Sequence, residues 1–126
     1  MAWIAQSIGL AIGAAIITIG LMYVSRPTVV AGSFGLPLPD GLNVEAWLRL
    51  KGVRDIVSGT TLLTFVALGE PRWVGVLLLS FAVIPVGDMI VILANKGSVR
   101  TALGVHALTA IFMAAAGIIL TYGARA

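Results

Sequence analysis

Residues 3–24 read WIAQSIGLAIGAAIITIGLMYV, and this run contains no charged side chain. A helix needs roughly 20 mostly apolar residues to cross the hydrocarbon core of a bilayer. The whole chain of 126 residues has the same character, because 60% of it is hydrophobic and only 10% is charged. An average soluble domain is about 25% charged. We therefore predict an integral membrane protein that has the lipid bilayer as its partner.

Charge and cysteine content exclude several classes of function. The 8 basic and 5 acidic residues give a net charge of +3. The basic residues form no stripe on a polar surface, so nucleic acid is not a predicted partner. The absence of cysteine excludes disulfides, thiolate metal sites and CxxC redox chemistry. No cofactor is predicted.

Three more apolar segments follow the first. They are separated by turns at residues 70–72, where proline ends one helix and starts the next, and at residues 95–98. The segments are too long for strands and do not alternate polar with apolar residues. The sequence predicts an all-α fold, a transmembrane four-helix antiparallel bundle in a single domain over residues 1–126. The predicted helices cover residues 3–24, 47–69, 73–94 and 99–122.

The long loop between the first two predicted helices leaves two interpretations open. Residues 25–44 mix glycine and proline with apolar side chains such as Val29, Phe34 and Leu36. This segment either dips back against the bundle or rests on the lipid headgroups. At its end, Asn43 is a predicted N-cap for the second helix.

A GxxxG motif in the first helix is formed by Gly9 and Gly13. Such motifs are often association faces between helices. We expect this one to pack within the bundle, with residues 114–117 of the fourth helix as its partner. The alternative is that the same face joins two copies of the chain in a homo-oligomer.

The basic residues are divided unevenly between the two ends of the predicted helices. Six lie near the end that holds residues 25–44 and 95–98, whereas only Arg72 and Arg125 lie near the other end. The positive-inside rule then places both termini on the non-cytoplasmic side of the plasma membrane. The aromatic residues predicted to mark the two interfaces are Trp3, Trp73 and Tyr122 at one, and Tyr23 and Trp47 at the other.

Three ionisable residues lie at one depth on three different predicted helices. At a rise of about 1.5 Å per residue, Asp55, Asp88 and His106 lie roughly 9–10 Å inside the same end of their helices. Charges that face lipid cost about 2.5–3.5 kcal/mol each on insertion scales, so we expect these side chains to point into the bundle. The sequence therefore predicts a polar pocket in one leaflet.

Helical spacing indicates which residues share a helix face with each of these three. Lys51, Asp55 and Ser58 share one face of the second helix, and Arg54 lies one position round and stacks over Ser58. The predicted companions of Asp88 are Phe81, Ile84, Pro85 and Asn95, and those of His106 are Thr109 and Met113.

Several short motifs resemble a known family. They are Arg26-Pro27 and the stretches GSFGLP (residues 32–37), KGVRD (51–55), IPVGD (84–88) and GVH (104–106). Together they resemble a family of small four-span membrane proteins that is known only as a domain of unknown function and is distantly similar to DoxX proteins. The resemblance covers nearly the whole chain and implies a four-helix membrane fold. Some fungal members of that family look associated with pathways for lipophilic natural products.

The leading hypothesis is a membrane protein that binds a lipophilic small molecule and converts it by acid–base chemistry. Two carboxylates in a low-dielectric pocket can divide the roles of base and acid, and the one beside Arg54 stays ionised as the base. The predicted catalytic residues are Asp55 and Asp88 for proton transfer, Arg54 to orient them, and His106 as a proton shuttle. Such a set suits isomerisation, cyclisation or epoxide opening. Predicted substrate contacts are Ser58, Asn95, Thr109 and Phe34.

Three other interpretations use the same residues. An ion pair of Arg54 with Asp88 or Asp55 would only hold helices in register, and His106 would then bond Thr109 or a carboxylate. A binding or transport module would hold an anionic or polar headgroup at this place. A metal site from the two carboxylates and His106 is disfavoured, because Arg54 would repel a cation and the chain has a single histidine.

Overall fold

All described residues of the chain fold into helices and the loops between them. The computed structural model describes residues 2–38 and 40–123, and no β-strand occurs in these two ranges. The predicted all-α class is therefore confirmed. Arg125 is one of the two basic residues on which the predicted orientation depends, and it lies outside the described residues. Three helical segments are long and apolar enough to cross a membrane, namely Gln6–Ser25, Pro71–Ala94 and Val99–Gly123.

The first two predicted helices form close to their expected bounds. Helix α1 covers Ala2–Ser25 and α3 covers Val44–Ala67. Asn43 does precede α3, but it has a φ of 65° and its side chain makes no capping hydrogen bond. The predicted role of Asn43 as a side-chain cap is therefore wrong, and the residue serves instead as a left-handed turn position, which Asn tolerates better than most residues.

The third and fourth predicted helices are each interrupted. Helix α4 covers Pro71–Phe81 and α5 covers Val83–Ala94, with Ala82 between them. Pro85 explains this break, since a proline inside a helix leaves the carbonyl four residues earlier without its donor. The last segment begins with α6 (Val99–Thr101), passes through the π-helical turn η1 (Ala102–Ala107), and continues as α7 (Leu108–Gly123).

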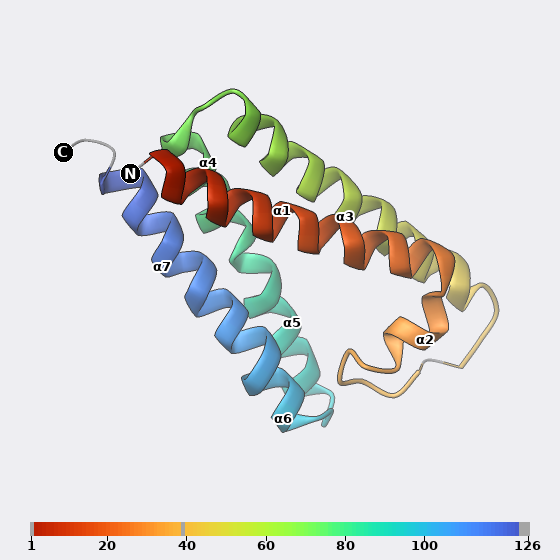
Figure 1. The fold of residues 1–126 in the computed structure, drawn as a ribbon. Coiled ribbons are helices and arrows are strands. Elements are labelled where there is room, and N and C mark those ends of the chain that lie inside the picture. Colours follow the sequence, from red (N-terminus) through yellow and green to blue (C-terminus); the bar gives the residue numbers. More distant parts are fainter. Residues whose placement is uncertain (1, 39, 124–126) are drawn as a thin grey trace.

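The long helices associate as two pairs. Helix α1 packs along α3, and α4 packs along α7 (Figure 1). Glycines allow the close approach in the first pair: a Cβ atom added to Gly20 would lie 2.7 Å from the Gly52 carbonyl oxygen, and one added to Gly52 would lie 2.6 Å from that of Gly20. Gly75 and Gly117 face each other in the same way across the second pair, at 2.9 Å in both directions.

The GxxxG motif of α1 packs inside the molecule. A Cβ atom added to Gly13 would lie 2.6 Å from the side chain of Leu63, and one added to Gly59 would lie 2.7 Å from the Gly13 carbonyl oxygen. Intramolecular packing of this motif is therefore confirmed. The predicted partner was wrong, because the motif faces α3, whereas Gly117 of the fourth segment faces α4.

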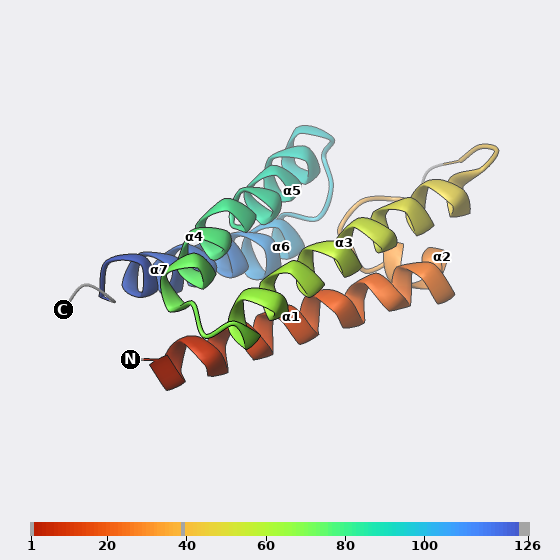
Figure 2. The ribbon, with the colours of Figure 1, turned by 90° about the horizontal axis from the view of Figure 1, so that it is seen from above.

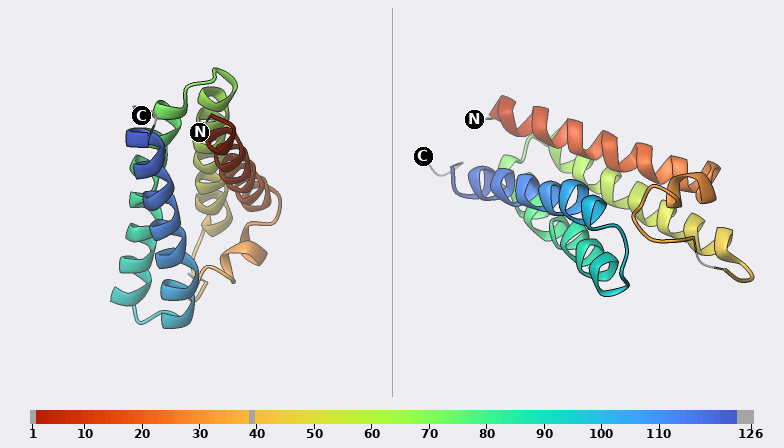
Figure 3. Two further views of the ribbon diagram at one scale, coloured as in Figure 1. Left: turned by 60° about the vertical axis from the view of Figure 1, so that its left-hand side comes forward. Right: turned by 90° about the horizontal axis from the view of Figure 1, so that it is seen from below.

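A hydrophobic core joins the two pairs at one end, and the pairs diverge toward the other. The start of α1 and the end of α7 lie at the joined end, while α2 and the α5–α6 turn lie at the divergent end (Figures 1 and 3). Figure 2 shows the same separation of the pairs from above. The buried core residues are Leu62, Val66, Val74, Leu78, Ala82, Met113, Ala116 and Leu120.

The segment between α1 and α3 dips back against the bundle at the divergent end. It contains a short helix, α2 (Pro27–Ala31). Beyond this helix the Ser98 amide donates a hydrogen bond to the Gly35 carbonyl at 2.8 Å, and the rings of Phe34 and His106 lie 4.8 Å apart, edge to face. The first of the two interpretations of the loop is therefore confirmed.

The glycine contacts predict a specific pattern of destabilisation. Gly52→Ala places a methyl group against backbone of α1, so we expect a loss of about 1–3 kcal/mol in the free energy of unfolding, as for other overpacked sites. Gly87→Ala is the matched control, because no atom lies within 4 Å of its added Cβ. Unfolding titrations in mixed micelles measure both. Equal stability of the two variants would contradict close packing of α1 on α3.

Candidate functional site

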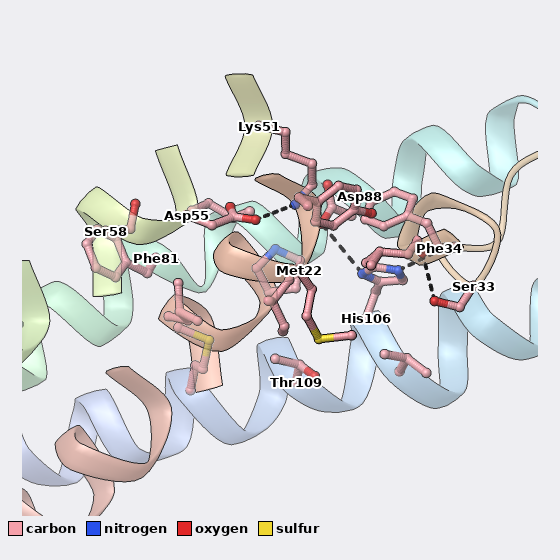
Figure 4. Close-up of a pocket in the computed structure, with 18 residues that line it drawn as sticks. Met22, Ser33, Phe34, Lys51, Asp55, Ser58, Phe81, Asp88, His106 and Thr109 are labelled. Atoms are coloured by element: carbon pink, nitrogen blue, oxygen red, sulfur yellow. Dashed lines mark hydrogen bonds and ion pairs between the residues drawn. The ribbon is translucent and has the colours of Figure 1, made fainter. Parts of the chain in front are cut away.

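A cleft of about 350 Å³ lies between the two helix pairs, on the divergent side of the core. Both pairs and the segment after α2 contribute to its wall, which is mostly apolar and carries four ionisable groups in addition to Tyr23 (Figure 4). We call it the inner cleft. Its lining residues are Ile16, Ile19, Met22, Tyr23, Val30, Ser33, Phe34, Lys51, Asp55, Ser58, Phe81, Ile84, Pro85, Asp88, Val105, His106, Thr109 and Met113.

Lys51 and Asp55 form an ion pair on the wall that α3 contributes. The Lys51 Nζ lies 2.7 Å from Asp55 Oδ2, which a spacing of four residues on a helix allows. The same ammonium lies 4.4 Å from the centre of the Tyr23 ring and 5.6 Å from that of Phe34. One carboxylate and two aromatic rings therefore surround the Lys51 ammonium.

Asp88 of α5 and His106 of η1 lie side by side on the wall opposite α3. The His106 Nε2 lies 3.2 Å from the Phe34 carbonyl oxygen, and that oxygen can only accept, so Nε2 carries a proton. The His106 Nδ1 lies 3.6 Å from Asp88 Oδ2, an ion-pair distance too long for a hydrogen bond. The His106 Nδ1 and the Asp88 carboxylate therefore lie side by side without a direct hydrogen bond.

Tyr23 belongs to the site and not to the lipid interface. Its side chain is only 2% exposed and lines the inner cleft, so its predicted place in an aromatic belt was wrong. Trp3, Trp47 and Trp73 are 69%, 70% and 53% exposed, as residues of such a belt would be. The burial of Tyr23 follows from its position opposite Gly52, where α1 and α3 meet.

The structure brings together six of the eight residues predicted for the site. The six are Asp55, Asp88, His106, Ser58, Thr109 and Phe34, and all of them line the inner cleft.

Arg54 and Asn95 lie outside the inner cleft, so the structure does not bring them together with the other six predicted residues. Arg54 is exposed, because the face of α3 that holds Lys51, Asp55 and Ser58 turns toward the cleft and Arg54 projects from its edge. Lys51, and not Arg54, is the cation that pairs with a carboxylate. Asn95 is also exposed, and its side-chain amide donates to the Val91 carbonyl at 2.8 Å.

A second cleft, of about 380 Å³, lies next to the first beneath the segment that follows α2. We call it the loop cleft. Tyr23, Phe34, Lys51 and Asp88 line both clefts and so form the boundary between them. Its other lining residues are Ala31, Leu36, Pro37, Leu38 and Leu48.

Irregular backbone flanks the site on two helices. The π-helical turn η1 carries His106, and the α4–α5 break with Pro85 lies before Asp88. A π-helical turn often marks a functional site, and a proline inside a helix leaves a backbone carbonyl without its usual donor. Both irregularities therefore fit a built cleft better than simple helix packing.

The acidic residues and His106 do not assemble a metal site. Within residues 2–38 and 40–123, no three His, Cys, Asp or Glu side chains are grouped closely enough to hold a metal ion. Asp55 is directed to Lys51, whereas Asp88 is directed to His106. The arrangement consists of two pairs, each of one carboxylate with one basic side chain.

The family described as "Domain of unknown function (DUF4267)" matches residues 13–120 of the chain. The chain belongs to this family. The matched residues of DUF4267 include every ionisable residue of the inner cleft. The resemblance to a domain of unknown function, predicted from the motifs, is thus confirmed. No curated protein and no solved structure matches the chain.

Proposed function

We propose that the chain crosses the plasma membrane as a four-helix antiparallel bundle and binds a lipophilic small molecule in the inner cleft. The observation that carries the proposal is an apolar cleft of about 350 Å³ with ionisable groups gathered in its wall. Ligand sites for small molecules have volumes of about 300–1,000 Å³ and combine an apolar lining with a few polar groups.

Helix α3 is the fourth span in this proposal. Its first half is the most highly charged part of the chain, but two of its cations are paired: Arg49 lies 3.0 Å from Glu45, and Lys51 lies 2.7 Å from Asp55. Its packing along the whole of α1 supports a crossing of similar length. The excess of basic residues at the divergent end supports a cytoplasmic location for that end, with both termini on the opposite side.

The ionisable groups of the cleft are suited to acid–base conversion of the bound molecule. Asp55 is the carboxylate paired with a cation, so it takes the role of base. In this proposal Asp88 and His106, whose Oδ2 and Nδ1 atoms lie 3.6 Å apart, take the role of acid and supply the proton that is transferred. In epoxide opening, this proton passes to the epoxide oxygen as a C–O bond breaks, and water attacks the carbon and gives up its proton to Asp55. Isomerisation or cyclisation would use the same two roles.

Binding is tested with a photoreactive probe that carries no charge. A long-chain alkyl alcohol with a diazirine group should label residues of the inner cleft when the protein is held in lipid nanodiscs. Ser58→Phe should abolish this labelling, because Ser58 lines the cleft and the ring would fill it. Thr60→Phe is the control on the same helix, because Thr60 is exposed and lies outside the cleft. Peptide mapping by mass spectrometry measures the labelling. Equal labelling of both variants would refute the site.

Conversion is tested with a long-chain terminal epoxide. We expect wild-type protein to form the diol, and Asp88→Asn to lose that activity by about 10²-fold or more while it still binds the alkyl alcohol probe. Glu70→Gln removes a carboxylate far from the cleft and should leave the rate unchanged. Product is measured by mass spectrometry. Diol formation that Asp88→Asn leaves unaltered would show that the cleft binds without catalysing this reaction.

A further inference from the structure

We infer that the inner cleft selects a lipophilic cation, such as a long-chain amine, over a lipophilic acid. This inference rests on the proposed binding function and specifies the charge of the ligand.

The clefts contain very little positive charge although the chain is basic overall. Among the described residues, Lys51 is the only lysine or arginine that lines either cleft. It is offset by two carboxylates, Asp55 and Asp88. Lys51 and Asp55 form one ion pair, and Asp88 supplies a second carboxylate that lies beside His106. The polar part of the cleft therefore holds two carboxylates and a single lysine, so it offers an anion no excess of positive charge.

The surroundings of the Lys51 ammonium are those of an ammonium-binding site. It contacts one carboxylate at 2.7 Å and lies over the faces of Tyr23 and Phe34. Aromatic faces attract cations and repel anions because the ring quadrupole is negative on its face. Lys51 itself is an ammonium on a flexible aliphatic stem. The protein therefore already places one amine of its own where a ligand amine would be stabilised.

Asp88 retains capacity to bind a second ammonium. In the part of the chain that the structure describes, its only ion-pair partner is His106, at 3.6 Å. Its side chain lines both clefts together with the same two aromatic rings. A carboxylate binds an ammonium more strongly than it binds a hydroxyl group, because its hydrogen bonds with the ammonium are charge-assisted. The aliphatic part of such a ligand would lie against the apolar wall formed by residues such as Ile16, Ile84 and Met113.

The test compares three diazirine probes of one chain length that end in an amine, an alcohol or a carboxylate. With wild-type protein in nanodiscs of neutral lipid, we expect the amine to label cleft residues about tenfold more than the carboxylate, with the alcohol between them. Labelling is normalised to that of exposed residues on the lipid-facing side, which removes differences in partitioning. Carboxylate labelling equal to or above amine labelling overturns the inference.

Substitution of Lys51 should affect a site for amines and a site for acids in opposite directions. Lys51→Met removes the internal ammonium and leaves Asp55 and the aromatic faces for the ligand, so amine labelling should rise severalfold. Arg54→Met removes a cation outside the clefts and is the control, with no change. A site for acids would instead lose carboxylate labelling in Lys51→Met. A fall in amine labelling in this variant, with the protein still folded by size-exclusion chromatography, also overturns the inference.

The effect of Asp88 is tested separately. Asp88→Asn should lower amine labelling about tenfold relative to alcohol labelling, because only the charged ligand needs the carboxylate. Equal losses for amine and alcohol would contradict a charge-selective role. Failure of the alcohol to label wild-type protein would refute the proposed binding function itself, whereas alcohol labelling without amine preference would refute only the charge selection. The comparison of the three probes on wild-type protein holds even where a variant fails to fold.

Discussion

Close backbone contacts at glycines are the interaction on which the rest of this structure depends. Helix α1 meets α3 where Gly20 faces Gly52, and α4 meets α7 where Gly75 faces Gly117. In a bilayer, the lipid tails are as apolar as the side chains, so helices associate chiefly through such close packing. The chain therefore contains two tightly joined pairs. The apolar core links these pairs at one end only, and the space between them at the other end becomes the inner cleft.

The polar groups are located where the helix pairs diverge. Charged side chains in a membrane must be paired or must face an internal cavity, and the divergent end provides both conditions. Lys51 satisfies Asp55 within α3, and His106 connects α5 and the loop by its contacts to Asp88 and the Phe34 carbonyl. The loop thus completes the site across the gap between the two pairs.

Much of the fold could be predicted from the sequence. Apolar runs and their breaks give the helical class, and the common depth of Asp55, Asp88 and His106 gives the position of the polar site. These features can be predicted from a sequence because they depend only on the rise per residue of a helix and on the energetic penalty of burying charge.

What could not be predicted depends on helix rotation and on irregular backbone. Successive residues in a helix differ by about 100° in direction, so the choice of Lys51 over Arg54 requires knowledge of where α1 packs on α3. Gly52 fixes that contact, which directs Tyr23 inward as well. The π-helical turn at His106 could not be predicted, because Ala102–Ala107 contains no proline that would mark a break in the helix.

The measurement that tests the central claim most directly is thiol reactivity of single cysteines in nanodiscs. The chain has no cysteine of its own, so each introduced thiol reports one position. Ser58→Cys and Thr109→Cys line the cleft, whereas Thr60→Cys and Phe112→Cys lie on exposed faces outside it. A cleft with ionisable groups in its wall between the helix pairs predicts that the first two react faster with a water-soluble thiol reagent. Equal reactivity at all four positions would contradict it.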